Sequence, residues 1–252
     1  MRTLLITGAS SGIGRATALH AGRTRDYRIA VHYRSQRAEA ERVVAALADT
    51  GTEAVAIAAD LGDEAQIVAL YDAVERALGP VDAVVNSAGV VAPKSKVGAL
   101  QADALRTLLS VNVLGVMLSC REAARRMAGA GNGGVIINVS SMAATIGGRP
   151  GSAAYAASKA AVDAFTVGLA KEVAADGIRA VSLRPGMVDT EMTRDALADP
   201  AFAAAVQRSI PLGRAARPEE VAAPIVWLLS PEASFVSGAC IDVSGGGFHI
   251  AG

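Results

Sequence analysis

Tyr155 and Lys159 lie four residues apart in the run Tyr155-Ala156-Ala157-Ser158-Lys159. The surrounding stretch, Ser152–Asp176, is rich in alanine and has the apolar spacing of a helix. Side chains four apart on a helix are surface neighbours, with Cβ atoms roughly 5–6 Å apart. A tyrosine with an ordinary pKa of about 10 is a poor acid–base group at neutral pH, and a nearby cation lowers that pKa. The pair therefore predicts proton transfer between a carbonyl and an alcohol, with a chance pair as the alternative.

A glycine-rich turn follows the first strand-like segment. The run Thr7-Gly8-Ala9-Ser10-Ser11-Gly12-Ile13-Gly14 leads directly into a helical pattern. Glycines allow a tight turn and let the backbone approach a pyrophosphate, which the N-terminus of the helix attracts. The spacing differs from the G-x-G-x-x-G form, so the motif is a variant of that fingerprint. We expect a nucleotide to bind here; the alternative is a turn without a ligand.

The second strand ends in His32-Tyr33-Arg34-Ser35. Sites selective for NAD place an acidic residue near this point to bind the ribose 2′-hydroxyl, whereas an arginine accommodates a 2′-phosphate. No acidic residue occupies the turn, so Arg34, assisted by Ser35, favours NADP(H) over NAD(H). The alternative is that Arg34 is a solvated residue at the start of a helix.

Short strand-like runs alternate with longer helical patterns along the chain. This alternation predicts an α/β fold, a doubly wound parallel β-sheet with helices on both faces (a Rossmann fold), in a single domain spanning residues 1–252. The expected strands are Thr3–Thr7, Arg28–Tyr33, Glu53–Ala59, Val81–Asn86, Val135–Ser140, Ile178–Leu183 and Ala239–Val243. The expected helices are Gly12–Arg23, Gln36–Thr50, Asp63–Leu78, Ala102–Met127, Ser152–Asp176 and Pro218–Ser230.

Composition excludes several classes of protein. Hydrophobic residues make up 52% of the chain and charged residues 19%, which argues against disorder. Lys+Arg and Asp+Glu both total 24, so no charge field points to nucleic acid or a membrane surface. The most apolar helical pattern, Leu105–Cys120, is interrupted by Arg106 and Asn112, and no signal peptide is expected. Two cysteines and three histidines form no disulfide framework or metal-ligand pattern, so we expect a soluble, cytoplasmic protein without a metal.

In combination, these motifs resemble the short-chain dehydrogenase/reductase family, in its compact single-domain branch, over essentially the whole chain. Thr7–Gly14 matches the cofactor loop of the family, and Asp60 matches the carboxylate that meets the adenine amino group. Asn86-Ser87-Ala88-Gly89 matches a motif beside the adenosine, although the family usually has asparagine where Ser87 stands. Pro185–Thr190 matches the segment that binds the nicotinamide carboxamide. The cofactor-binding residues so predicted are Gly8, Ser10, Ser11, Gly12, Ile13, Gly14, Arg34, Ser35, Asp60, Leu61, Asn86, Ala88, Gly89, Tyr155, Lys159, Pro185, Gly186, Val188 and Thr190.

The resemblance also implies a catalytic set: Asn112, Ser141, Tyr155 and Lys159. By this resemblance the protein is an NAD(P)(H)-dependent oxidoreductase that interconverts a ketone and a secondary alcohol by hydride transfer. Tyr155 donates the proton, Ser141 binds the substrate oxygen, and Lys159 lowers the Tyr155 pKa and binds the nicotinamide ribose. Asn112 holds a water that links Lys159 to solvent.

The substrate stays open at the level of sequence. The segment at about residues 190–212 is expected to contain a short helix over the substrate, and its alternating charges (Glu191, Arg194, Asp195 and Asp199) imply no strongly charged ligand. The pattern resembles both sugar 1-dehydrogenases and 3-oxoacyl-carrier-protein reductases. A nucleotide-sensing protein without catalysis and a methyltransferase are alternatives from other classes. The family resemblance favours a homotetramer, or else a homodimer.

Overall fold

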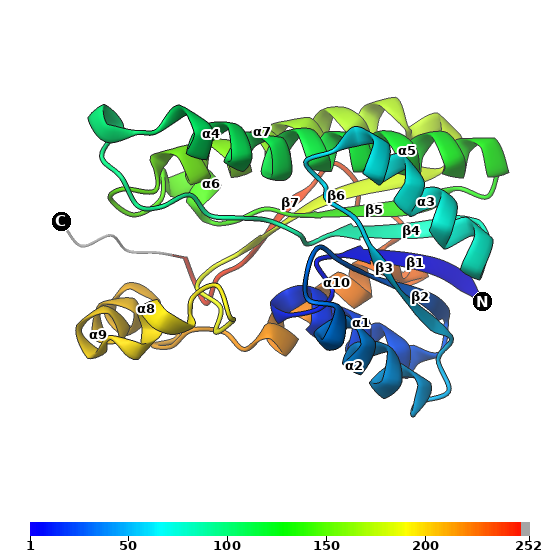
Figure 1. Cartoon of the computed structure of the whole chain (residues 1–252), viewed down its shortest axis with the longest axis horizontal. Helices are drawn as coiled ribbons and strands as arrows, with labels where there is room; N and C mark the ends of the chain where they lie inside the picture. The colour runs from blue at the N-terminus through cyan, green and yellow to red at the C-terminus, as the bar shows by residue number, and fades with distance from the viewer. Residues whose placement is uncertain (248–252) are drawn as a thin grey trace.

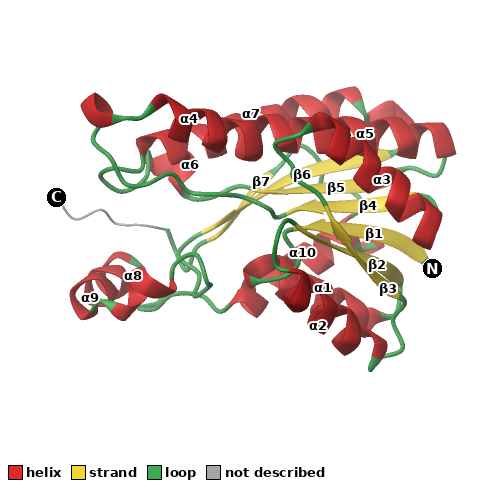
Figure 2. Ribbon diagram, viewed as in Figure 1, coloured by secondary structure: helices red, strands yellow, loops and turns green. Residues whose placement is uncertain are grey.

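Seven strands form one parallel sheet, and the computed structural model describes residues 1–247. The strands are β1 (Arg2–Thr7), β2 (Tyr27–Tyr33), β3 (Ala54–Ala58), β4 (Val81–Asn86), β5 (Gly134–Val139), β6 (Ile178–Pro185) and β7 (Cys240–Val243). Their order in the sheet is β3-β2-β1-β4-β5-β6-β7, so the direction of winding reverses between β1 and β4 (Figure 2). This is the doubly wound arrangement expected from the sequence, and its ligands bind beyond the carboxyl ends of the strands at the reversal.

Helices cover both faces of the sheet (Figure 1). One face carries α1 (Gly12–Thr24), α2 (Arg37–Ala48) and α10 (Pro218–Leu229). The other face carries α3 (Glu64–Leu78), α4 (Ala102–Leu109), α5 (Val116–Ala130) and α7 (Ala153–Glu172). Beyond the carboxyl ends of the strands lie α6 (Ala143–Ile146), α8 (Arg194–Ala198) and α9 (Pro200–Ser209).

The central strands bury both of their faces, which explains their unbroken apolar runs. On β1, Leu4 and Ile6 belong to the apolar layer under α1, α2 and α10, whereas Leu5 belongs to the layer under α3, α5 and α7. All three side chains are fully buried. The central strands are therefore held from both sides, and the loops at their carboxyl ends start from fixed positions.

The long helix expected at Ala102–Met127 is interrupted in the structure. A π-helical segment, Ser110–Gly115, separates α4 from α5. Within the described residues, the whole run Ala102–Ala130 is long and apolar enough to cross a membrane by length and composition. Its α5 part, however, buries Cys120 and Met127 in the layer against the sheet, as a core helix does.

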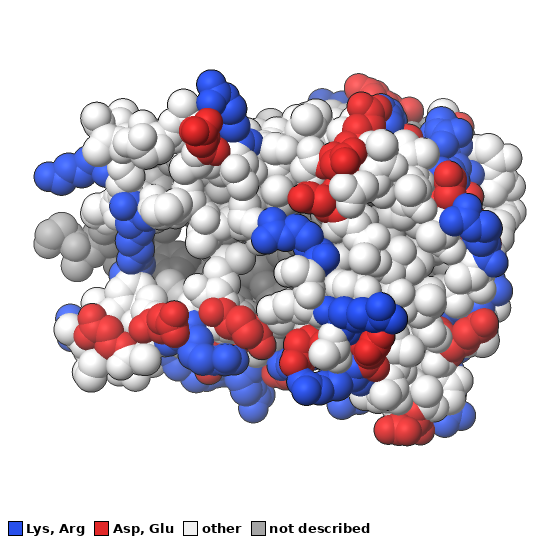
Figure 3. Space-filling view, viewed as in Figure 1, with Lys and Arg blue, Asp and Glu red and all other residues white. Residues whose placement is uncertain are grey.

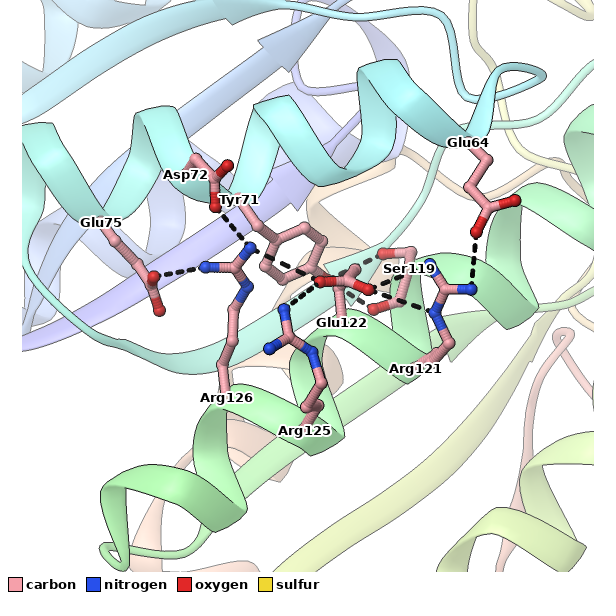
Figure 4. A network of polar contacts seen from close by, with 9 residues as sticks. All are labelled: Glu64, Tyr71, Asp72, Glu75, Ser119, Arg121, Glu122, Arg125 and Arg126. Atoms are coloured by element: carbon pink, nitrogen blue, oxygen red, sulfur yellow. Dashed lines mark hydrogen bonds and ion pairs between the residues drawn. The ribbon is translucent and has the colours of Figure 1, made fainter.

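An ion-pair network joins α3 to α5 (Figure 4). Glu122 on α5 is only 3% exposed and accepts hydrogen bonds from Arg125 at 2.7 Å and from Arg126 at 3.4 Å. Arg126 also reaches across to α3, where it lies 2.6 Å from Asp72 and 2.5 Å from Glu75. Glu122 is the buried member of this network, and removing its arginine partners would leave its charge without compensation. The network therefore ties α5 to α3.

Two other expected elements differ from the observed ones. The helix expected at Ser152–Asp176 ends at Glu172 and is followed by a separate 3₁₀ turn at Ala174–Asp176. The segment at residues 190–212 contains two short helices, α8 and α9, rather than one. Asp199 separates them because its carboxylate accepts the Ala201 N–H at 2.9 Å and caps α9.

Candidate active site

A first cavity of about 330 Å³ opens at the carboxyl ends of β1 to β4. The turn from β1 into α1 forms one wall, and its N-cap residue Ser11 makes no side-chain capping bond. The first N–H groups of α1 thus lack a side-chain partner and can attract a phosphate. The predicted cofactor-binding residues that line this cavity are Gly8, Ser10, Ser11, Gly12, Ile13, Gly14, Arg34, Ser35, Asp60, Leu61, Ala88, Gly89 and Thr190.

The glycines of this turn are required by close backbone contacts. Gly8 has a φ of +66°, and a Cβ atom there would lie 2.8 Å from the Cα of Ala88. A Cβ atom on Gly14 would lie 2.3 Å from the carbonyl oxygen of Gly8. The first turn of α1 therefore packs directly on the end of β1, leaving a backbone-lined cradle. This cradle fits the pyrophosphate of a dinucleotide.

His32 holds the same turn from the side, a role that the sequence analysis missed. Its Nδ1 accepts the Gly8 N–H at 3.0 Å, so the ring proton lies on Nε2, which contacts the Ala59 carbonyl oxygen at 3.1 Å. Burial lowers the pKa of His32 to about 4, an effect opposed by its hydrogen bond to Ala59. The neutral ring thus connects the glycine turn after β1 to the end of β3, next to Asp60.

We predict that His32 makes the stability of the protein depend on pH. An unfolded histidine has a pKa of about 6.5, so between pH 6.5 and 4 the unfolded chain binds more protons than the folded one. Its contribution is complete above pH 6.5 and is lost as pH falls toward 4, by about 3 kcal/mol. Urea unfolding at pH 7 and pH 4.5 measures the free energy of unfolding at each pH. Between these two pH values this free energy should fall less in His32→Asn than in wild type. The control His20→Asn, on α1, should show the same fall in the free energy of unfolding as wild type. Equal pH dependence in wild type and His32→Asn would contradict the role given to His32.

A second cavity of about 600 Å³ adjoins the first, and both are lined by Ile13, Ser87, Gly89, Thr190 and Met192. The two cavities therefore form one continuous cleft, and Figure 3 shows this face of the molecule hollowed near its middle. The predicted site residues that line the second cavity are Ile13, Gly89, Ser141, Tyr155, Lys159, Pro185, Gly186, Val188 and Thr190. Segments from four regions of the sequence thus meet at one place.

Tyr155 and Lys159 lie together in the second cavity, as expected, but their electrostatics differ from the expectation. The Lys159 Nζ lies 6.0 Å from the centre of the Tyr155 ring and donates a hydrogen bond to the Val139 carbonyl oxygen at 2.9 Å. Burial raises the pKa of Tyr155, and a hydrogen bond with Ser141 opposes this rise. Burial also lowers the pKa of Lys159 to about 8, although the negative charge of the nearby Asp163 opposes this shift. The structure therefore does not show the lowering of the Tyr155 pKa expected from Lys159, because burial of the phenol dominates.

Asn112 lies in the π-helical segment, fully buried, and lines neither cavity. Its Oδ1 accepts the Val90 N–H at 2.8 Å, and its Nδ2 donates to the Val90 carbonyl oxygen at 2.9 Å and to the Ser158 hydroxyl at 3.2 Å. A Cβ atom on Gly89 would lie 3.4 Å from this Oδ1 and 3.5 Å from the Lys159 Nζ. Asn112 therefore holds the segment after β4 against α7, beside Lys159.

Asn86 also lies outside both cavities, unlike the cofactor contact predicted for it. Its Nδ2 donates to Asn138 at 2.8 Å, and its Oδ1 accepts from the Ser119 hydroxyl at 2.7 Å. Asn86 thus ties β4 to β5 and α5. The following residue, Ser87, lines both cavities although the sequence analysis did not choose it. Within residues 1–247 no group of three histidine, cysteine or acidic residues is placed to hold a metal ion.

Comparisons with known proteins identify the family of the chain. A family model described as enoyl-(acyl carrier protein) reductase matches residues 8–249. The uncharacterized oxidoreductase YgfF of Escherichia coli is 43% identical, and the match covers 98% of this chain and 100% of that protein. An L-rhamnose 1-dehydrogenase (NAD(P)(+)) of a Sphingomonas species is 34% identical, covering 97% of this chain and 95% of the relative. A 3-oxoacyl-[acyl-carrier-protein] reductase of Synechocystis is also 34% identical, covering 96% and 95%.

Solved structures give the same result for the fold. A mutant short-chain dehydrogenase/reductase of Serratia marcescens superposes with a TM-score of 0.91 at 32% identity, over 97% of each chain. A short-chain dehydrogenase of Burkholderia cenocepacia, solved in complex with NADP, superposes with a TM-score of 0.90 at 33% identity, also over 97% of each chain. Relatives that are named dehydrogenases and reductases set aside the sensor and methyltransferase alternatives. The chain belongs to the short-chain dehydrogenase/reductase family, the NAD(P)-binding oxidoreductases that interconvert CH–OH and C=O groups.

Proposed function

We propose that this protein reduces a ketone to a secondary alcohol with NADPH, and catalyses the reverse oxidation with NADP, using Tyr155 as the acid–base group. The observation that carries the proposal is the shared lining of the second cavity by Ser141, Tyr155 and Lys159. This cavity is continuous with the first, where the glycine turn and Arg34 fit a dinucleotide. The cleft thus places the reacting groups beyond the end at which the cofactor is held.

The bound cofactor supplies the hydride, and the protein supplies position and proton transfer. In reduction, the Ser141 hydroxyl donates a hydrogen bond to the substrate oxygen, and the Tyr155 hydroxyl donates its proton to the developing alkoxide. The raised pKa of Tyr155 keeps the phenol protonated at neutral pH, which suits a proton donor. Lys159, held by the Val139 carbonyl, binds the nicotinamide ribose hydroxyls. Asn112 holds Val90 and Ser158 in place beside Lys159. We propose that it also positions a water molecule through which Lys159 exchanges protons with solvent.

The reaction can be tested by following the absorbance of NADPH in the presence of ketones, diketones, sugars and acyl thioesters. We expect turnover with at least one carbonyl class and none with NADPH alone. Sugar 1-dehydrogenase and 3-oxoacyl-carrier-protein reductase activities are the two subtypes to compare first, since relatives of both kinds match the chain. Cofactor binding without turnover across the whole panel would contradict the proposal.

We predict that Arg34 sets the preference for NADPH. Arg34 lines the first cavity and forms no ion pair within residues 1–247, so its guanidinium can meet a 2′-phosphate. A charge-assisted bond of this kind is worth about 1.5–3 kcal/mol, and an aspartate would add repulsion. Arg34→Asp should therefore lower kcat/KM for NADPH about hundredfold and change the value for NADH less than threefold.

Arg37→Gln is the matched control for this change, since Arg37 is the neighbouring exposed arginine and pairs with Glu41 at 2.7 Å. Arg37→Gln should leave kcat/KM for NADPH and for NADH within about twofold of the wild-type values. A wild-type protein that prefers NADH would contradict the role of Arg34.

The proposal also covers the oligomeric state of the protein and its location in the cell. Trp227 on α10 is 43% exposed, and Phe235 is fully exposed in the following loop. Single exposed apolar side chains are common on protein surfaces, so these two do not mark an interface by themselves. The family membership of the chain supports a homotetramer or homodimer, which light scattering tests directly. We infer a cytoplasmic enzyme that acts on a small molecule, and not on nucleic acid or membrane.

A further inference from the structure

We propose that the second cavity selects substrates that carry a carboxylate, bound by Lys94, Arg149 and Arg208 at its mouth. The reacting carbonyl or alcohol carbon lies deeper, against Tyr155. The inference deepens the function proposed above and rests on it. It names the substrate class as oxo and hydroxy acids with an apolar body.

The charges that line the second cavity are all of one sign. Its charged lining residues are Lys94, Arg149, Lys159 and Arg208. No aspartate or glutamate is among the described residues that line it. The acidic residues of segment 190–212 lie elsewhere: Glu191 lines the first cavity, and Asp195 and Asp199 line neither. The alternating charges of that segment do not line the second cavity, so they do not exclude a charged substrate as the sequence analysis expected.

Two of these cations converge on one aromatic ring. The Arg149 guanidinium carbon lies 4.9 Å from the centre of the Phe202 ring, and the Lys94 Nζ lies 5.2 Å from the same centre. The Arg149 Nη2 also donates a hydrogen bond to the Ser209 hydroxyl at 3.3 Å. Residues 94, 149 and 202–209 come from three separate segments, so the fold itself brings these charges together. Arg208, on α9, lines the same cavity.

The loops that carry these cations are joined through the backbone. The Ser95 N–H donates to the Gly151 carbonyl oxygen at 3.1 Å, which pairs the segment of Lys94 with the loop of Arg149. Arg149 then connects that loop to α9 through Ser209. The mouth is thus built from contacting elements, and an anion would meet groups already in place. Such preorganisation reduces the entropy lost on binding.

Lys94, Arg149 and Arg208 lack a counter-ion in the part of the chain that the structure describes. None of them lies within 4.0 Å of an acidic oxygen there, whereas Arg194, on the neighbouring α8, pairs with Glu191 at 3.6 Å. Like charges around one cavity repel one another, and an anion between them relieves that repulsion. A guanidinium and an ammonium provide the donors that a carboxylate accepts. The mouth therefore has the charge and the donors for a carboxylate.

The positions of the lining residues between the mouth and the interior of the cavity indicate what the rest of the ligand must be. Lys94 and Arg208 are exposed and Arg149 is half-buried, whereas Lys159 is only 4% exposed. The walls are mainly apolar side chains: Val91, Met142, Ile146, Met187, Met192 and Phe202. A ligand that reaches from the mouth to Tyr155 thus needs an apolar body between its carboxylate and its reacting carbon.

The test compares 5-oxohexanoate with its methyl ester, which has the same carbonyl and no charge, using NADPH and the full chain. We expect wild-type kcat/KM to be at least about tenfold higher for the acid, because hydrogen bonds to charged groups add about that much. Lys94→Gln, Arg149→Gln and Arg208→Gln should each lower the value for the acid by about threefold to tenfold. All three should leave the ester within about twofold. Arg194→Gln, which removes an α8 arginine outside the cavity lining, should change neither.

The outcomes separate this inference from the function on which it rests. Turnover of the ester at a kcat/KM equal to or above that of the acid overturns the carboxylate site and leaves the reductase activity intact. Equal losses for acid and ester in Arg149→Gln, with no acid-specific loss in Lys94→Gln or Arg208→Gln, also overturn it, since Arg149 then acts by holding α9. Failure to reduce either compound or any other carbonyl, with NADPH still bound, overturns the proposed function itself.

Discussion

Replacing Tyr155 with phenylalanine is expected to lower kcat for carbonyl reduction about a thousandfold while NADPH still binds. The variant keeps the ring and removes only the hydroxyl, which is the group proposed to give its proton to the developing alkoxide. General acid catalysis by a positioned side chain contributes about 10²–10⁴-fold. Ser141 and Lys159 stay in the cavity, so the loss should appear in kcat more than in KM. Steady-state kinetics and a fluorescence titration with NADPH measure the two parts separately.

Tyr27→Phe is the matched control for this change. The Tyr27 hydroxyl is buried and donates to the Leu229 carbonyl oxygen at 3.0 Å, but it lies at the start of β2, away from the carboxyl ends that form the cleft. Its removal should cost stability and leave kcat within about twofold. If Tyr155→Phe kept more than a tenth of the wild-type kcat, Tyr155 would not be the proton donor.

Gly14→Ala is expected to weaken NADPH binding about hundredfold and to destabilise the fold by up to about 3 kcal/mol. The added methyl group would lie 2.3 Å from the Gly8 carbonyl oxygen, so α1 must move away from the end of β1. Overpacking of this kind costs about 1–3 kcal/mol, and a shift of about 1 Å in a positioned group can cost a hundredfold in function. Isothermal titration with NADPH and urea unfolding give the two values.

Gly129→Ala tests whether any glycine replaced in a helix has such an effect. Gly129 lies near the end of α5, and a Cβ atom there meets nothing within 4 Å. Alanine should stabilise that helix slightly and leave NADPH affinity unchanged. NADPH affinity in Gly14→Ala equal to that of Gly129→Ala would contradict the role given to the glycine turn.

Sequence patterns were sufficient for the sheet and for most of the cleft. Apolar runs such as Val135-Ile136-Ile137 predict strands buried on both faces, and the structure places them at the centre of the sheet. The glycine turn and the Tyr155–Lys159 spacing are local features, so they can be interpreted without knowing the packing around them. The structure accordingly places these residues in the two cavities.

Features that depend on tertiary packing were not predicted. The π-helical segment at Ser110–Gly115 packs tightly: a Cβ atom on Gly115 would lie 2.3 Å from the Leu61 carbonyl oxygen, a contact no local pattern encodes. The sign of the Tyr155 pKa shift depends on burial, whereas spacing shows only that Lys159 is near. The basic mouth joins Lys94, Arg149 and Arg208, which are far apart in the sequence.

Deuterium transfer tests the central claim most directly, because it follows the hydride and the proton donor together. NADPH that carries deuterium in both C4 positions of the nicotinamide is mixed with a reducible ketone, and the alcohol is analysed by mass spectrometry for wild type and Tyr155→Phe. The account predicts one deuterium on the former carbonyl carbon with wild type, and transfer about a thousandfold slower with Tyr155→Phe although NADPH still binds. Transfer by Tyr155→Phe at the wild-type rate, or a wild-type alcohol without deuterium at that carbon, would contradict it.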